Sequence, residues 1–391
     1  MRFSFWEITP LALFIIFIAP VAIVLFSLTG DYSDNWSHLY QYVLTRYILN
    51  TAYLVAGVTI LVTIVGVGTA WLVTNYNFTG KNTFEWALIL PLAVPPYILA
   101  YTFTGLFDTF GTANNLIRDV FDLGREFTFF PKVRNVPGAI VVFSFTLYPY
   151  VYLVSRMAFI NQSRTMLEAG RTLGLNKFQT FYKLGVPMIR PAIIGGLMLV
   201  IMETISDFGA VDHFAISTFT TGVFRTWYGM YDIETAKQLA SLLLIFAVTL
   251  IMIERYSRKN ASYSNAMSLY KPLYLIKLTG VRNILAFIMC FTPIFIGFLL
   301  PVMELLYWAL NYKLDFFNDK FITTAWNTFY LALIAAFLCS LLAVIINFSI
   351  RYKSNNYLKV MSSFLTVGYA VPGLILAIGV MQMLTYFDQS F

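Results

Sequence analysis

The sequence predicts an all-α fold: a polytopic membrane helix bundle of about nine transmembrane helices, built as two related halves of which the second is incomplete. The composition is the first of three observations behind this prediction. The 391 residues are 59% hydrophobic and 12% charged, whereas about a quarter of an ordinary soluble domain is charged. The second observation is a series of apolar runs that approach the roughly 20 residues needed to cross a bilayer. The third is an internal repeat.

The apolar runs follow one another along the whole chain. The predicted spans cover residues 8–28, 51–73, 87–107, 138–159, 192–208, 240–253, 284–310, 325–350 and 357–386. The first run resembles a signal peptide, but it is long, contains Pro10 and Pro20, and lacks a small-x-small cleavage site. We therefore interpret it as a retained span. Cys290 and Cys339 lie within apolar runs, so they say nothing about the redox compartment.

The distribution of Lys and Arg over the short loops predicts the orientation. With the N-terminus in the cytoplasm, nine of the 26 basic residues fall outside, which leaves 17 on the cytoplasmic side. The nine are Arg46, Arg118, Arg125, Lys132, Arg134, Arg225, Lys237, Lys313 and Lys320. This bias follows the positive-inside rule. Because the net charge of +7 is spread over loops between spans, it argues against nucleic-acid binding and for a lipid bilayer as the environment.

An internal repeat relates the two ends of the chain. NTAYL at 50–54 recurs as NTFYL at 327–331, and AVPPYILA at 93–100 recurs as AVPGLILA at 370–377. Both matches have the same offset of 277 residues, which apolar composition alone does not produce readily. We therefore expect two related membrane halves.

The repeat predicts the domain organisation. The first half covers residues 1–256 with six helices, a cytoplasmic linker covers 257–282, and the second half covers 283–391 with three helices. A polar loop of the first half, residues 163–191, has no counterpart in the second half, which ends before the matching position. Two explanations stay open: the chain is truncated, or another chain supplies the second copy of this loop.

The polar loop is expected to form two short helices. Thr165 and Glu168 have the spacing of a capping box, and Gly174 can adopt the left-handed conformation that ends a helix. Asn176 can cap a second helix that ends near Gly185 and Pro187. Phe178, Phe181 and Tyr182 would then share one face of that helix, and the loop carries the basic residues Arg171, Lys177, Lys183 and Arg190. Such an element is suited to docking a soluble partner.

The loop resembles the EAA loop of binding-protein-dependent ABC importer permeases, whose pattern is EAA, three residues, G, nine residues, I, one residue, L and P. This chain keeps the spacing and has Gly170 for the last Ala, Leu184 for Ile and Val186 for Leu. In that family the loop docks on a separate ATP-hydrolysing subunit. The resemblance therefore implies an ATPase-coupling role for Glu168, Ala169, Gly170, Gly174, Phe178, Leu184 and Pro187.

A second resemblance lies around the loop. LYPYVYL at 147–153, METISDFG at 202–209, TFTTGVFRTW at 218–227 and ASLLL at 240–244 resemble the fused, two-half permeases of ferric-iron importers. The resemblance implies a multi-pass permease of the bacterial inner membrane that receives ferric iron from a periplasmic or extracellular solute-binding protein. A permease of the same family for thiamine, phosphonate, sulfate or spermidine is the alternative, and a secondary transporter is a more distant one.

The resemblance also sets the expected partners. A full complex contains two copies of an ABC ATPase subunit, one on each coupling loop, so the loop missing from the second half would have to come from another permease chain if this chain is complete. The sequence has no G-x-x-x-x-G-K-[ST] phosphate-binding loop. We therefore expect no cofactor in this chain, with ATP bound by the partner subunit, and no enzyme activity of its own.

Prolines and acids mark the candidate pathway. Pro95 and Pro96 in the third span and Pro372 at the matching place predict paired kinks that suit a gate, although prolines also kink helices for packing alone. Glu203 and Asp207 are four residues apart at the outer end of the fifth span, where a charge is costly. They suit a cation pathway, or they are satisfied by backbone amides or by Arg225. We assign no metal site, since two carboxylates and one His are too few.

Overall fold

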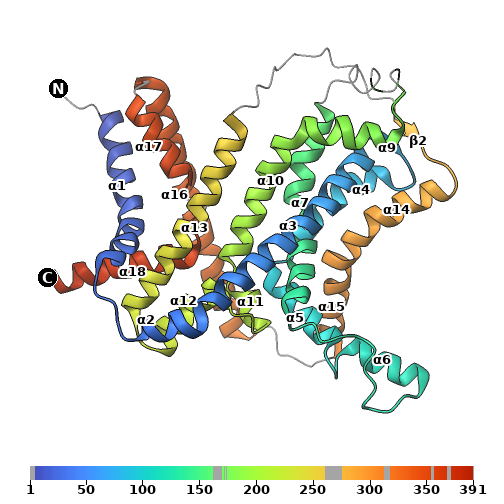
Figure 1. Ribbon diagram of the computed structural model, residues 1–391, viewed down its shortest axis with the longest axis horizontal. Helices are drawn as coiled ribbons and strands as arrows, with labels where there is room; N and C mark the ends of the chain where they lie inside the picture. The colour runs from blue at the N-terminus through green and yellow to red at the C-terminus, as the bar shows by residue number, and fades with distance from the viewer. Residues whose placement is uncertain are drawn as a thin grey trace. The chain divides into compact units, whose positions relative to one another are not determined.

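The computed structural model describes residues 5–161, 170, 172, 174–259, 275–311, 318–353, 356–367 and 371–390. These residues form two compact units, one made of Met1–Asp31 with Leu306–Phe391 and the other of Tyr32–Leu305. Most of them are helical (Figure 1), which confirms the predicted all-α fold.

The larger unit, Tyr32–Leu305, contains most of the helices. They are α2 (Asn35–His38), η2 (Leu39–Val43), α3 (Leu44–Asn75), α4 (Lys81–Ala87), η3 (Leu90–Ala93), α5 (Pro96–Phe107), α6 (Thr112–Phe121), α7 (Val136–Ile160), α9 (Lys177–Thr180), η4 (Phe181–Gly185), α10 (Val186–Ser206), α11 (Gly209–His213), α12 (Phe219–Phe224), η5 (Arg225–Gly229), α13 (Ile233–Lys259), α14 (Val281–Ile294) and η6 (Phe295–Leu299). Helix α15 (Leu300–Asn311) runs across the boundary to the other unit.

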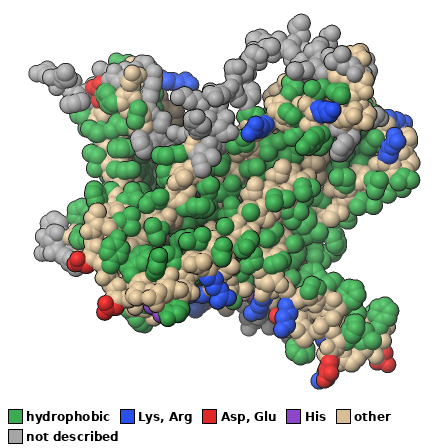
Figure 2. All heavy atoms as spheres, viewed as in Figure 1, with side chains coloured by type: hydrophobic (Ala, Val, Ile, Leu, Met, Phe, Trp, Pro, Cys, Tyr) green, Lys and Arg blue, Asp and Glu red, His purple; other side chains and the backbone are tan. Residues whose placement is uncertain are grey.

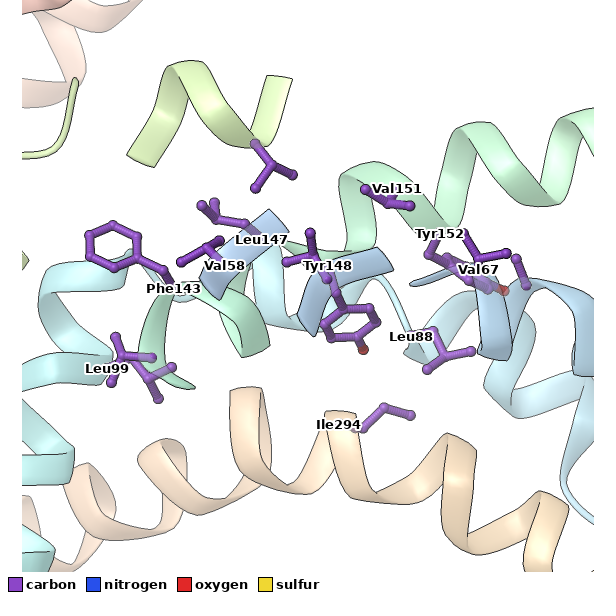
Figure 3. Packing of buried hydrophobic residues seen from close by; sticks show 14 of the residues in the cluster. Val58, Val67, Leu88, Leu99, Phe143, Leu147, Tyr148, Val151, Tyr152 and Ile294 are labelled. Carbon is purple, nitrogen blue, oxygen red and sulfur yellow. The ribbon is translucent and has the colours of Figure 1, made fainter. Parts of the chain in front are cut away.

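The core of this unit lies where α3, α7 and α10 pack together. Val58 of α3 and Leu147, Tyr148 and Val151 of α7 are buried there (Figure 3). The helices approach closely because of glycine: a Cβ on Gly66 of α3 would lie 2.9 Å from the Cβ of Val151. Small residues at such crossings are typical of membrane helices, where packing rather than water exclusion holds helices together.

The smaller unit is built around α1 (Phe5–Phe26), which is followed by η1 (Ser27–Thr29). Helix α1 packs against α16 (Asp319–Lys353), α17 (Asn356–Val367) and α18 (Gly373–Ser390). The contact with α18 is close, because a Cβ on Gly379 would overlap the backbone carbonyl of Pro20. Helix α16 exposes nearly all of its large apolar side chains.

The lengths and compositions of the helices confirm a polytopic membrane bundle. Within the described residues, seven helices are long and apolar enough to span a bilayer: Trp6–Thr29, Asn35–Asn75, Val136–Ile160, Phe181–Ser206, Ile233–Met252, Val281–Asn311 and Asp319–Tyr352. An eighth span would be the pair Lys81–Ala93 and Pro96–Phe121, which is bent by 88°. We call it the bent pair, with Lys81–Ala93 as its first arm and Pro96–Phe121 as its second arm. Figure 2 shows hydrophobic side chains over the middle of the larger unit and Lys and Arg side chains toward its two ends, as expected for a membrane-embedded surface.

Two of the nine predicted spans differ from the prediction. Residues 87–107 were expected as one kinked span and are instead divided between α4, η3 and α5. Residues 357–386 are divided between α17 and α18. In both places the second helix begins at the Pro-Pro or Pro-Gly pair, because proline lacks the N–H that would continue the preceding helix.

The helix boundaries follow the sequence repeat. Helix α5 begins at Pro96 and α18 begins at Gly373, at the offset of 277 residues found in the sequence. Helix α3 begins at Leu44 and its counterpart α16 at Asp319, so these starts agree with the offset to within two residues. The two halves therefore share their local structure as well as their sequence pattern.

The first helix of each half packs against helices of the other half. In the smaller unit, α1 lies against α16, α17 and α18, which belong to the second half of the repeat. In the larger unit, α14 lies against α3 and α4, and η6 lies against η3, all from the first half. Each compact unit therefore combines helices of both halves of the repeat. The division at 256 and 283 follows the repeat and stays a prediction, because residues 260–274 of the linker lie outside the described residues.

A short strand pairing joins the end of the linker to the loop after α3. Strands β1 (Tyr76–Asn77) and β2 (Ile276–Lys277) pair in parallel. Next to them, the side chain of Asn283 accepts a hydrogen bond from the Thr79 amide at 2.9 Å and donates one to the Thr79 hydroxyl at 3.0 Å. These bonds fix the start of α14 beside the start of α4.

Candidate functional site

The predicted coupling loop is partly described. Glu168, Ala169 and the predicted capping box of Thr165 with Glu168 lie outside the described residues. Gly174 has φ of 85°, the left-handed conformation predicted for it. No atom lies within 4 Å of a Cβ placed on Gly174, so the requirement for glycine comes from the backbone and not from crowding.

The second loop helix begins as predicted. The carboxamide of Asn176 accepts a hydrogen bond from the Gln179 amide at 2.8 Å, and the Gln179 side chain accepts one from the Asn176 amide at 3.0 Å. This reciprocal arrangement satisfies two amides at the start of α9. Phe178 lies in the backbone of α9.

The predicted end of this helix near Gly185 and Pro187 is wrong. The chain passes from α9 through the wide turn η4 directly into α10, and Phe181–Ser206 forms one candidate span. A π turn accommodates Pro187 in the first turn of α10, where its missing N–H costs least. The predicted coupling loop is therefore continuous with a candidate membrane helix.

The expected aromatic face is also different. Phe181 turns inward onto Trp71, with ring centroids 5.1 Å apart, and Trp71 in turn contacts Phe159 of α7. Tyr182 is 68% exposed, so Phe181 and Tyr182 do not share a face. Along this stretch the exposed residues are Tyr182, Lys183, Pro187 and Arg190.

Gly170 and Leu184 pack against each other across the loop. Gly170 is buried, and a Cβ added to it would overlap the Cδ1 atom of Leu184. Leu184 is half-buried against the core of the larger unit. Two residues of the predicted motif, one early and one late in the predicted coupling loop, therefore meet.

An ion-pair cluster connects the helix before the loop to the first arm of the bent pair. Arg156, one turn before the end of α7, donates to the Glu85 carboxylate at 3.2 Å, and Lys81 also pairs with that carboxylate. Tyr152 donates to the backbone carbonyl of Glu85 at 2.9 Å. The sequence analysis missed this cluster; the i, i+4 spacing of Lys81 and Glu85 was its only local signal.

The bend of the candidate gate lies at Pro95 and Pro96. Val94 and Pro95 are extended, and α5 begins at Pro96 after the short helix η3. In the smaller unit Pro372 is buried just before α18, and its carbonyl accepts a hydrogen bond from the Ile375 amide at 2.9 Å. The predicted paired kinks are thus paired helix starts. Their role as a gate stays a prediction.

Glu203 and Asp207 do not form a helical i, i+4 pair. Helix α10 ends at Ser206, and Asp207 is extended with ψ of 129°. The Asp207 carboxylate accepts hydrogen bonds from the amides of Ala210 at 2.8 Å and Val211 at 3.4 Å. Asp207 therefore caps α11, which agrees with the structural alternative considered for it. Glu203 lies half-buried in the last turn of α10.

The cap on α11 brings His213 against the second arm of the bent pair. His213 Nε2 lies 2.9 Å from the Thr104 hydroxyl, and the His213 ring meets Tyr97 and Tyr101 edge-on at 6.1 and 5.8 Å. Burial and the nearby Arg134 lower the pKa of His213, while Asp212 opposes them.

We term Tyr97, Tyr101, Thr104 and His213 the aromatic cluster. Sequence reasoning missed its α5 members, although their i, i+4, i+7 spacing directly after Pro96 marks one face of a helix. Tyr97 and Tyr101 remain about half exposed. Within the described ranges, no three His, Cys, Asp or Glu residues gather as a metal site.

Comparison with known proteins gives a family match. Residues 62–254 match the family model described as "Binding-protein-dependent transport system inner membrane component". The chain is 27% identical over 346 residues to the Fe(3+)-transport system permease protein FbpB 2 of Haemophilus influenzae, which covers 87% of this chain and 62% of that relative. It is 26% identical over 208 residues to the probable sulfate transport system permease protein cysT of Chlorokybus atmophyticus, covering 53% and 70%.

A solved structure shares the fold. It is a bacterial ABC transporter involved in the import of the acidic polysaccharide alginate, and one of its chains matches with a TM-score of 0.53 and 14% identity. The match covers 65% of this chain and 93% of that chain. At this identity the likeness concerns the fold of the helices alone. The relatives themselves are named as transport permeases and not as enzymes.

Proposed function

We propose that this chain, whose residues 62–254 match the inner membrane components of binding-protein-dependent transport systems, is the permease subunit of an ATP-driven importer for ferric iron. Its substrate would arrive on a solute-binding protein, and its loop at 163–191 would dock on a separate ATPase subunit. The N-terminus and this loop would lie in the cytoplasm, as the distribution of basic residues predicts.

One observation carries the choice of ferric iron. The alignment with the Fe(3+)-transport permease extends over 87% of this chain, through both halves of the repeat, whereas the alignment with the sulfate permease stops at 53%. Tyr97 and Tyr101 on α5 and Asp207, which caps the neighbouring α11, carry oxygen atoms of the kind that hard cations prefer. Sulfate is the second candidate, since a sulfate permease also matches.

The continuity of η4 with α10 supports a mechanism for coupling. The 26 residues of Phe181–Ser206 make a helix about 39 Å long at 1.5 Å per residue, enough to cross the bilayer. A displacement of the docking element would therefore move α10 as a body. The far end of α10 meets α11 through the Asp207 cap, and α11 packs against α5 beyond the Pro95–Pro96 bend.

A second connection would act at the membrane face on which the predicted coupling loop lies. Arg156 of α7 holds Glu85 of α4, and α4 is the first arm of the bent pair. The two arms of the bend would thus be linked to the two helices that flank the docking element. Alternating access needs such a linkage, because the gate has to change when the ATPase changes.

The docking role is tested with two glycine variants. Gly174→Ala places a Cβ on a left-handed residue, which costs about 1–2 kcal/mol and should distort the loop. Gly195→Ala is the matched control, because Gly195 lies within α10 with no atom near its Cβ position. We expect copurification of the ATPase subunit in detergent to fall with Gly174→Ala and to persist with Gly195→Ala. Equal recovery from both variants would remove the docking role.

A further inference from the structure

Helix α6 follows α5 after a tight turn. The Gly111 amide donates to the Asp108 carbonyl at 2.7 Å, and a Cβ on Gly111 would overlap the carbonyl of Leu106. The chain therefore passes from α5 into α6 through a four-residue turn, and both helices belong to the second arm of the bent pair, Pro96–Phe121. Within the chain, α6 lies before α7 and the coupling loop after it, so α7 separates the two by about 37 Å along its 25 residues.

The face of α6 that packs against its own chain is polar. Asn114 and Arg118 are 1% and 6% exposed. Arg118 donates to the carbonyls of Phe127 at 2.8 Å and Thr109 at 2.6 Å. Asn114 accepts hydrogen bonds from the amides of Phe129 and Phe130. These two side chains hold the following loop onto α6 by hydrogen bonds, not by apolar packing.

The exposed face of α6 is apolar. Leu116 is 63% exposed, and Val120 and Phe121 are each 68% exposed. The neighbouring loop residues Phe110, Phe127 and Phe129 are exposed as well. Polar residues Asn115 and Asp119 occupy a third, separate side of the helix. Figure 2 shows green side chains beside charged ones over α6, at the lower right.

This arrangement reverses that of a helix on a water-soluble protein, which buries its apolar face. Leaving a Leu, Val or Phe side chain in water is less favourable than burying it, and the cost grows with the apolar area exposed. The apolar face of α6 is therefore expected to be covered. Because α6 begins at the end of a membrane helix, the nearest apolar medium is the bilayer itself.

A hydrogen bond sets the depth of α6. The Thr112 hydroxyl, at the first residue of α6, donates to the Glu304 carboxylate of α15 at 2.6 Å. Glu304 lies seven residues before the end of the span Val281–Asn311, or about 10 Å along its axis. The 31 residues of that span measure about 46 Å, which exceeds the roughly 30 Å hydrocarbon core by about 8 Å on each side. Glu304 and Thr112 therefore lie near the edge of the hydrocarbon.

We propose that α6 is an interfacial anchor that lies in the headgroup region with Leu116, Val120 and Phe121 inserted toward the acyl chains. Amphipathic helices bury their apolar faces about 5–10 Å into this boundary. The aromatic rings of Phe110, Phe127 and Phe129 extend the same surface. The anchor fixes the end of α5, so α5 pivots about a point held at the membrane surface. The occupant of the apolar face is lipid, on the side of the bilayer opposite the coupling loop.

Site-directed spin labelling tests the anchor in the intact chain. Cys339→Ala removes the exposed cysteine, while the buried Cys290 does not react. Leu116→Cys and Val120→Cys then place a nitroxide on the apolar face, and Asn115→Cys on the polar side is the matched control. After reconstitution in phosphatidylcholine vesicles, power saturation compares collisions with oxygen, which partitions into lipid, and with a water-soluble nickel chelate.

We expect oxygen collisions to dominate at 116 and 120 and nickel collisions to dominate at 115. All three positions are exposed, so the substitutions leave the packed core unchanged. Nickel-dominated labels at 116 and 120 would overturn the proposal. Protection of both positions from both reagents only after adding a solute-binding protein would also overturn it and would assign the face to that partner. The result does not depend on what the permease transports.

Discussion

Gly170 occupies a position where the resembling family pattern has Ala, and the structure supplies a reason. The room that an Ala Cβ would need is filled by the Cδ1 atom of Leu184, a residue where the pattern has Ile. Two departures from the pattern thus lie against each other and compensate in volume. The pair could not be recognised from sequence alone, because the thirteen residues between them give no sign of this contact.

The compensation predicts coupled effects on stability. Gly170→Ala alone should lower the thermal stability in detergent, since overpacking costs about 1–3 kcal/mol and the gain in helix propensity returns at most about 1 kcal/mol. With Leu184→Val in place, the same Gly170→Ala change should be neutral or stabilising. A double-mutant cycle of unfolding midpoints measures the difference. Additive effects of the two substitutions would show that the residues do not press on each other.

Asp232 is the most heavily hydrogen-bonded carboxylate outside the spans of the described residues. It accepts from the Ser33 hydroxyl at 2.6 Å, the Asn35 amide group at 2.8 Å, and both the amide and the hydroxyl of Thr235. Burial raises the pKa of Asp232, but the bonds from Ser33, Thr235 and Asn35 outweigh it and lower the pKa to about 2. The carboxylate joins the segment before α3 to the start of α13.

This lowered pKa predicts a pH dependence. Because the folded pKa lies below the ordinary value of 3.8, the ionised form stabilises the fold. The stabilisation is complete above about pH 4 and is lost as the pH falls toward 2. Asp232→Asn should therefore lower the unfolding temperature at pH 5 and make progressively less difference below pH 4. A difference between wild type and variant that stays constant from pH 5 to pH 2 would contradict this role.

At the scale of helices, the sequence predicted where a helix breaks better than the direction that the next helix takes. The pattern AVPP at 93–96 marked the break in the third span, and the break is found there. Its bend of 88° did not follow from sequence, because proline only stops a helix and the direction of the next one depends on packing. The same limit explains Pro187. It was expected to end a helix, but the preceding π turn carries the chain through it.

The break between the two arms of the bent pair, at Pro95 and Pro96, predicts that replacing these prolines impairs transport. Pro95→Ala with Pro96→Ala restores two backbone donors and favours a continuous helix. We expect iron uptake to fall while copurification of the ATPase subunit is kept, because the docking element lies elsewhere in the chain. Pro137→Ala, in the first turn of α7 where proline is tolerated, should leave both unchanged. Full uptake by the double proline variant would remove the gate.

At the scale of the whole molecule, the family resemblance was readable from a few residues. The EAA-type spacing from Glu168 to Pro187 predicted it, and the family match over 62–254 confirms it. The repeat at an offset of 277 predicted the paired helices α3 and α16 and α5 and α18. The exchange of α1 and α14 between halves was not predicted, since a helix of uniform apolar character does not encode its neighbour.

The chain spans only part of its relatives, so its transport activity is a proposal about a larger assembly. The alignment covers 62% of the Fe(3+)-transport permease from Haemophilus influenzae. The proposed pathway would need a coupling element in each half, and the described residues include part of one candidate, the loop at 163–191. Activity is therefore measured with the ATPase, the solute-binding protein and any companion permease chain present.

The most direct test is ATP-dependent uptake by membrane vesicles that contain this assembly. Uptake of radiolabelled ferric iron, loaded on the solute-binding protein, is compared with uptake of radiolabelled sulfate, with and without ATP at the coupling-loop side. We predict iron accumulation that requires ATP and is lost with Gly174→Ala, and no sulfate accumulation. Iron accumulation that continues without ATP, or sulfate accumulation in place of iron, would contradict the account.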